Sequence, residues 1–91
     1  MNKISTASDW WGVNGVEAML RHNISNLKPG LKTDLLTMID ACDHLVHDLN
    51  LEEIECRRRH TQTKRHAELS ATINDRVDYI DQMITLGTLM S

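Results

Sequence analysis

Residues 31–89 read LKTDLLTMIDACDHLVHDLNLEEIECRRRHTQTKRHAELSATINDRVDYIDQMITLGTL, and this stretch decides the fold. Its apolar residues recur at spacings of three and four, which places them on one face of a helix. They form two blocks, separated by six equivalent positions that are mostly polar or charged. The blocks comprise Leu35, Met38, Cys42, Leu45 and Leu49, and then Ile73, Val77, Ile80 and Ile84. The gap between them predicts an interruption in the apolar contact face.

The two blocks are nearly symmetric about residues 60 and 61, so more than one architecture can pair them. An antiparallel helical hairpin that turns within residues 57–66 pairs Leu49 with Ile73 inside one chain. A continuous long helix of about 85 Å pairs the same residues between two chains of an antiparallel dimer. A break near Asn50, which has capping-box spacing with Glu53, is a third alternative.

Two arguments about residues 57–66 point in opposite directions. The segment lacks Gly, Pro, Asn and Asp, which favours a continuous helix because those residues supply most turns. A continuous helix in a dimer would, however, bring ten cationic side chains to one crossing, and like charges in contact are destabilising. We therefore predict the hairpin.

The amino-terminal part of the chain predicts a shorter helix. Residues 1–8 are polar and indicate a flexible terminus. Ser8 or Asp9 can cap a first helix over about residues 9–25, in which Gly12 and Gly15 are unfavourable. Residues 9–91 are expected to form a single helical domain.

The same sequence pattern predicts the ends of the helices and the residues of the core. Pro29 disfavours helical backbone at Lys28, so the second helix is expected to begin near Leu31. Gly87 is a candidate carboxyl-terminal cap, and the apolar residues around it are either a frayed tail or a short contact strip (Leu86, Leu89 and Met90). The predicted core consists of Val13, Val16, Leu20, Leu35, Ile39, Leu45, Leu49, Leu69, Ile73, Val77, Ile80 and Ile84.

The size and composition of the chain bear on its assembly and location. A chain of 91 residues buries only roughly 60% of its unfolded surface, so completion of the bundle by homodimerisation is expected. No apolar run approaches the roughly 20 residues that span a bilayer, and the terminus has no apolar signal region. Cys42 and Cys56 would lie about 21 Å apart on one helix, too far for a disulfide. A cytoplasmic protein without a membrane segment is predicted.

Candidate chemistry is sparse. Asp40, Asp43, His44, His47 and Asp48 cluster on a helix, but their positions lie away from the apolar seam, so a solvated polar face is the favoured interpretation. Cys56 precedes three arginines that would favour its thiolate, yet no positioned base or family-style catalytic motif accompanies it. The chain is predicted to be no enzyme and to require neither a metal nor another cofactor.

The remaining features indicate a contact surface. Trp10 and Trp11 differ in direction by about 100° on a helix, so one can enter the core while the other lies at its rim, where it can anchor a partner. Residues 57–66 carry five basic side chains and no acidic one, although the net charge of the whole chain is −3. We predict a non-enzymatic protein–protein interaction module that acts as a regulator, inhibitor or adaptor. Its predicted partner-binding residues are Trp10, Trp11, Arg57, Arg58, Arg59, Lys64 and Arg65.

The alternative function is a regulator that contacts DNA or RNA through the basic stretch 57–66. A basic chain, interleaved aromatic residues or a helix-turn-helix pattern would support it, and the sequence has none of these. A protein partner is therefore the favoured expectation.

Overall fold

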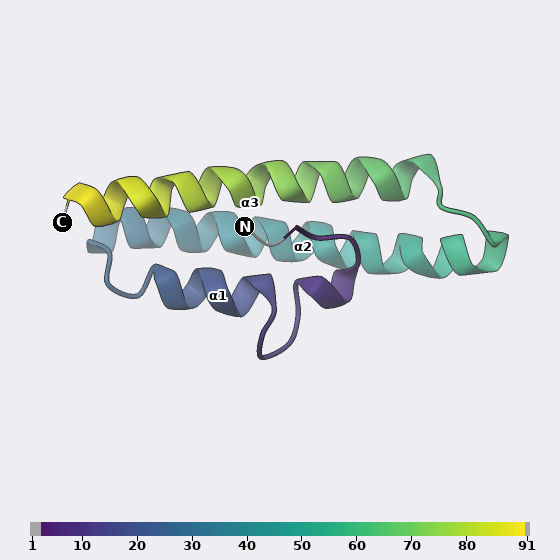
Figure 1. Ribbon diagram of the computed structural model, residues 1–91, viewed down its shortest axis with the longest axis horizontal. Coiled ribbons are helices and arrows are strands. Elements are labelled where there is room, and N and C mark those ends of the chain that lie inside the picture. Colours follow the sequence, from purple (N-terminus) through teal and green to yellow (C-terminus); the bar gives the residue numbers. More distant parts are fainter. Residues whose placement is uncertain (1–2, 91) are drawn as a thin grey trace.

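Four helical segments make up the computed structural model, which describes residues 3–90 (Figure 1). They are the short 3-10 helix η1 (Ala7–Asp9) and the α-helices α1 (Val16–Asn23), α2 (Pro29–Arg59) and α3 (Lys64–Met90). The described residues contain no strand, and the prediction of an all-α fold is confirmed. The molecule is elongated, with principal extents of 49 × 22 × 20 Å.

Helices α2 and α3 run side by side in opposite directions over most of the molecule, and α1 covers one part of the pair (Figure 1). Each long helix buries one apolar stripe at helical spacing, as the sequence predicts. A fully buried Leu or Ile contributes about 1.5–3 kcal/mol to folding. All residues of the predicted core are buried except Leu45, which is half-buried, and Val13.

The boundaries of α2 have local causes. Lys28 has the extended backbone (φ −60°, ψ 146°) expected of a residue before proline, and Pro29 occupies the first helical turn, where its missing N–H costs nothing. At the other end His60 takes the left-handed conformation, with φ 56°. The Thr61 N–H then donates to the Cys56 carbonyl and the His60 N–H to the Arg57 carbonyl, the two bonds of a Schellman motif.

Helix α3 begins with a side-chain cap and ends beyond the predicted position. The hydroxyl of Thr63 accepts the backbone N–H of His66 at 3.2 Å and donates to the Glu52 carboxylate at 2.6 Å, so the start of α3 is tied to α2. Gly87 is not a cap, because α3 continues to Met90. A Cβ at Gly87 would lie 2.5 Å from the side chain of Leu31, so this glycine permits the close approach of α3 to α2.

The predicted helix over residues 9–25 is only partly correct. The chain forms η1, then a turn, and α1 begins only at Val16. Gly12 adopts φ +103°, and a Cβ at Gly15 would lie 2.4 Å from the Trp10 carbonyl oxygen, so the turn requires glycine at both positions and ends with Gly15 as the N-cap of α1. Val13 lies on this turn and is 94% exposed, which corrects its assignment to the core.

The flexibility of residues 1–8 stays a prediction, but the described part of this segment, residues 3–8, makes contacts with α2 and α3; residues 1 and 2 lie outside the description. Ile4 and Ala7 are buried in the core. The Asn74 side chain accepts the Ile4 N–H at 2.7 Å and donates to the Ile4 carbonyl at 3.0 Å, and the Glu53 carboxylate accepts the Ala7 N–H at 2.8 Å. Polar composition concealed this segment because its polar side chains face solvent while its backbone bonds to α2 and α3.

Candidate functional site

The two predicted aromatic anchors have different environments. Trp10 is fully buried, and Trp11 is half-buried at the rim. Both indole N–H groups donate to the same carboxylate oxygen, Oδ1 of Asp43, at 3.0 Å for Trp10 and 3.1 Å for Trp11. The Trp11 ring also lies 5.0 Å from the His47 ring, between centroids. Trp10 is therefore a core residue and does not present a surface to a partner, whereas Trp11 keeps part of its ring exposed.

Asp43 joins the amino-terminal segment to α2. Burial acts to raise the pKa of Asp43, but the indole hydrogen bonds and the neighbouring His47 and His44 outweigh it and lower that pKa. Its second oxygen, Oδ2, lies 3.4 Å from His47 Nε2. The predicted polar face of α2 thus serves tertiary structure at Asp43. Among residues 3–90 no cluster of three or more His, Cys, Asp or Glu side chains is arranged to hold a metal ion.

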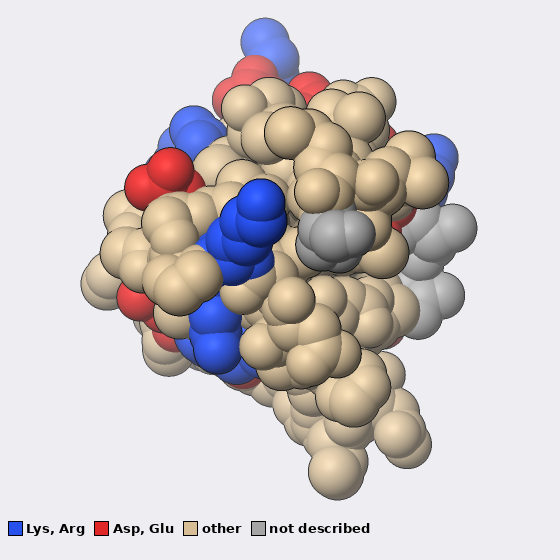
Figure 2. Space-filling model, turned by 90° about the vertical axis from the view of Figure 1, so that its left-hand side faces the viewer, with Lys and Arg blue, Asp and Glu red and all other residues tan. Residues whose placement is uncertain are grey.

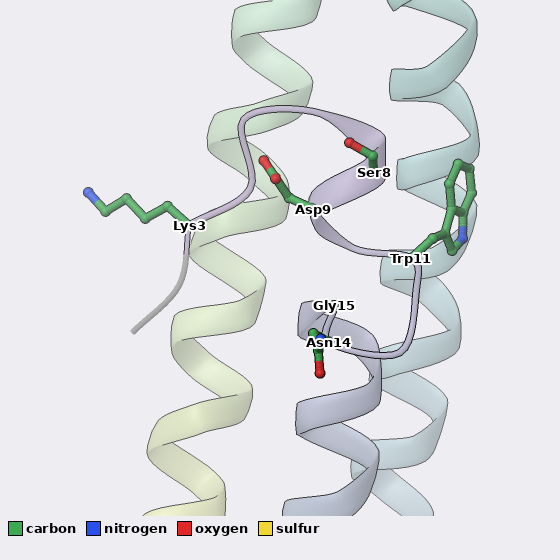
Figure 3. A pocket seen from close by; sticks show the side chains of 6 residues that line it. All are labelled: Lys3, Ser8, Asp9, Trp11, Asn14 and Gly15. Atoms are coloured by element: carbon green, nitrogen blue, oxygen red, sulfur yellow. The ribbon is translucent and has the colours of Figure 1, made fainter.

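A shallow polar hollow of about 470 Å³ lies beside Trp11, between η1 and the start of α1 (Figure 3). Lys3, Ser8, Asp9, Trp11, Asn14 and Gly15 line it. Asp9 accepts the backbone N–H groups of Ser5 and Thr6, and these bonds lower the pKa of its carboxyl group. The charged carboxylate of Asp9 therefore holds the backbone of Ser5 and Thr6 at the start of η1. In Figure 3 the Lys3 side chain points away from the other lining residues, so the hollow does not gather its polar groups around one point.

The five basic residues lie at one end of the molecule and are exposed there. Arg57, Arg58 and Arg59 occupy the last turn of α2, where cations are favourable at the negative end of the helix dipole. Glu55 forms ion pairs with Arg58 and with Arg59, the latter at 2.6 Å. The hydrogen bond from Arg58, and then that from Arg59, lowers the pKa of Glu55 to about 2. The single negative charge of Glu55 thus offsets only one of the two positive charges of Arg58 and Arg59.

Lys64 and Arg65 occupy the first turn of α3 at the same end. Lys64 Nζ lies 3.9 Å from a Glu68 oxygen across one helical turn, a geometry that stabilises little at an exposed site. The structure therefore brings Lys64 and Arg65 to the same end as the three arginines, while Trp10 and Trp11 lie on the amino-terminal segment beside the middle of α2. The predicted partner-binding residues do not form one surface.

Cys56 lies beside this basic end and is enclosed by hydrogen-bonding groups. Its sulfur accepts the backbone N–H of Thr63 at 3.4 Å and lies 3.6 Å from the Thr63 hydroxyl. His66, the buried histidine of α3, is held between Gln62 at 3.1 Å and Glu53 at 3.5 Å. These contacts give Cys56 and His66 structural partners in the turn. Both cysteines are free thiols, and burial raises the pKa of Cys42.

The opposite end of the molecule carries an apolar groove of about 490 Å³. It lies between the first turns of α2 and the last turns of α3, and Lys28 is the one charged residue that lines it. Figure 2 faces this end and shows mainly uncharged residues, with basic side chains crossing the surface. Its lining residues are Lys28, Gly30, Leu31, Met83, Leu86, Gly87 and Met90.

None of the residues that line the apolar groove is among the predicted partner-binding residues, although the sequence contains a signal for the groove. Leu86 is 51% exposed, and Met90 is 78% exposed. With Tyr79 and Met83 they form a second row on α3 at spacings of four, three and four, offset from the core row. The helix continues through Met90 and is not frayed there, while the contact strip stays a prediction.

None of the helices in residues 3–90 combines the length and apolar character that crossing a bilayer requires. Comparison of the chain with protein-family models, with curated proteins and with solved structures finds no match.

Proposed function

We propose that this chain is a non-enzymatic protein–protein interaction module that docks an apolar helical surface onto a partner, as a regulator, inhibitor or adaptor does. The observation that carries the proposal is the apolar groove between the ends of α2 and α3. Exposed contiguous apolar surface on a small protein marks interaction sites more often than scattered apolar residues do. Met83 and Met90 suit this role because flexible thioether side chains adapt to a docked surface.

The proposal also includes the setting and the assembly of the molecule. In it, α2 and α3 of one chain form the helical hairpin in solution, and a homodimer covers apolar surface that the single chain leaves exposed. Cytoplasmic location is part of the same proposal, supported by two free thiols, one of them buried in the core.

The test compares two substitutions of exposed leucines. Leu86→Arg places a charge in the groove, whereas Leu51→Arg places one on α2 at a side chain that is 64% exposed and outside the groove. In affinity capture from native extract, we expect the wild type and Leu51→Arg to retain the same partner and Leu86→Arg to lose it. Equal capture by both variants, with both folded by circular dichroism, would contradict docking through the groove.

Contact with nucleic acid is the second candidate, favoured by the gathering of five exposed basic residues at the other end of the molecule. If it operates, binding to duplex DNA or RNA falls steeply as salt increases. Because Glu55 already pairs with Arg58 and Arg59, Arg57→Glu together with Arg65→Glu is the sharper substitution. Absence of binding at low salt would exclude this candidate and leave the groove as the functional surface.

A further inference from the structure

Helix α3 presents a second apolar row beside the one that it buries. Tyr79, Met83, Leu86 and Met90 alternate spacings of four and three, the repeat that keeps a row in contact with another helix. Tyr79 is 49% exposed, Leu86 51% and Met90 78%, whereas Met83 is half-buried and packs partly against the core. The core row of the same helix (Val77, Ile80 and Ile84) is buried, and this helix packs along α2. Met83 contributes in part to packing within the chain, but the exposed ends of the second row at Tyr79, Leu86 and Met90 are available to another helix.

Charge is distributed unevenly along this second row. Residues 82–90 contain no charged side chain, and Lys28 lines the groove beside them with Lys32 one turn along α2. One to three turns earlier, α3 carries Asp75, Asp78 and Asp81 against the single Arg76. The carboxyl-terminal end of the row is therefore basic at its margin, and the preceding end is acidic.

From this row and its charges we infer that the groove receives a second copy of this chain, with the two α3 helices antiparallel. The inference rests on the proposed function and names its partner. Antiparallel pairing places Tyr79 of each copy near Met90 of the other and Met83 near Leu86. It also brings the acidic turns of each copy to the end of the other that carries Lys28 and Lys32, whereas parallel pairing would place like charges together. A two-fold arrangement uses the same patch twice and closes at two copies.

The size of the patch sets the strength of the contact. The row from Tyr79 to Met90 is about 16 Å long. The area that so short a row can bury is smaller than that of a standard-size interface. We therefore expect a dissociation constant in the micromolar to sub-millimolar range, so that the dimer dissociates on dilution. Such a dimer would compete with any other apolar helix for the same groove, which makes dimerisation a means of regulating access to it.

Sedimentation equilibrium over a concentration series tests the dimer. The wild type should pass from monomer to dimer mass as concentration rises toward about 1 mM, the weak limit of specific association. Leu86→Arg should weaken association at least tenfold, because it places a charge in an apolar contact. Leu51→Arg is the matched control and should behave as the wild type. A wild type that remains monomeric throughout would overturn the inference.

Charge exchange tests the pairing. Lys28→Glu with Lys32→Glu should weaken the dimer, and so should Asp75→Lys with Asp78→Lys. An equal mixture of the two double variants should form a heterodimer more strongly than either variant alone forms a homodimer. Lys64→Glu, at the far end of the molecule, is the control for a change of net charge alone. A mixture no stronger than its components would contradict the proposed charge pairing.

Cysteine cross-linking tests the direction of the helices. In a Cys56→Ser background, Tyr79→Cys and Met90→Cys should form a disulfide-linked dimer when mixed under mild oxidation, while neither should link efficiently alone. Linkage of Tyr79→Cys to itself would show parallel helices and overturn the antiparallel arrangement. If the wild type forms no dimer but captures another protein in a way that depends on Leu86, this inference is overturned and the proposed function stands.

Discussion

His60 turns the chain between α2 and α3 with a backbone conformation that an L-residue rarely adopts. The left-handed region costs most L-residues roughly 1–2 kcal/mol, although histidine occurs there more often than most side chains. The absence of Gly, Asn and Asp from residues 57–66 suggested continuous helix at the sequence level. That argument treated turn composition as a requirement, whereas the Schellman bonds of His60 and Thr61 form without it.

The strain at His60 leads to a prediction about stability. We expect His60→Gly to raise the free energy of unfolding by about 0.5–1 kcal/mol, which is the relief of left-handed strain less the entropic cost of glycine. Urea unfolding followed by circular dichroism measures the change. His60→Ala removes the same imidazole but keeps a Cβ, and should bring no such gain. An equal gain in both variants would assign the effect to the side chain instead of the backbone.

Asp43 gives a second prediction at this scale, concerning acid stability. Its pKa is lowered in the fold, so its contribution is fully present above the unfolded value of about 3.9 and is lost as the pH falls through the lower folded value. At neutral pH, Asp43→Asn should lower stability by about 1–2 kcal/mol, because two indole donors lose a charged acceptor.

Unfolding of the wild type and Asp43→Asn should be compared by tryptophan fluorescence between neutral pH and about pH 3, which brackets the ordinary aspartate value. The difference in stability should shrink on acidification, since the wild type must then protonate Asp43 and the amide does not titrate. A difference that stays constant down to the lowest pH would show that the charge on Asp43 contributes nothing.

The amino-terminal segment shows how an element can be held without regular secondary structure. Ile4 fills a core position, and its backbone is bonded by Asn74 and by the Ser70 hydroxyl, at 2.7 Å for Ser70. Glu53 holds Ala7 and faces His66 at the same time. This one segment therefore connects α2 to α3 near the middle of the molecule. The sequence predicts only a flexible terminus for it.

Truncation of Ile4 tests this role. Ile4→Ala should lower the free energy of unfolding by about 2–4 kcal/mol, the usual cost of removing a large aliphatic side chain from a core. Ser5→Ala changes the neighbouring exposed residue and should shift it by less than about 0.5 kcal/mol. Denaturant midpoints of both variants provide the measurement. Wild-type stability for Ile4→Ala would support the flexible terminus instead.

At the scale of the whole molecule, the pairing of α2 with α3 can occur within one chain or between exchanged chains, because the same side chains meet in both. We predict pairing within one chain, since the four residues His60–Thr63 are enough to reverse its direction. A mixture of isotopically labelled and unlabelled protein should show contacts between Leu49 and Ile73 only within the labelled chain. Contacts between Leu49 of a labelled chain and Ile73 of an unlabelled chain would indicate exchange of helices between copies.

The sequence by itself determined that the chain is helical and which faces of residues 31–89 are buried. Periodicity carries that information because a helix places residues three and four apart on one side, and the buried positions from Leu35 to Ile84 agree with it. It also predicted that one of Trp10 and Trp11 enters the core while the other lies at its rim, as the structure has them, although the helix assumed in that argument does not extend over these residues.

Only the tertiary structure decided how the amino-terminal segment packs and which surface is left exposed. The hydrogen bonds that hold Ile4 and the shared acceptor Asp43 join groups from segments far apart in the chain. The apolar groove likewise exists because α2 and α3 approach closely at Gly87 and leave Leu86 and Met90 uncovered. A local pattern records the apolar character of a residue, but exposure depends on what the rest of the chain covers.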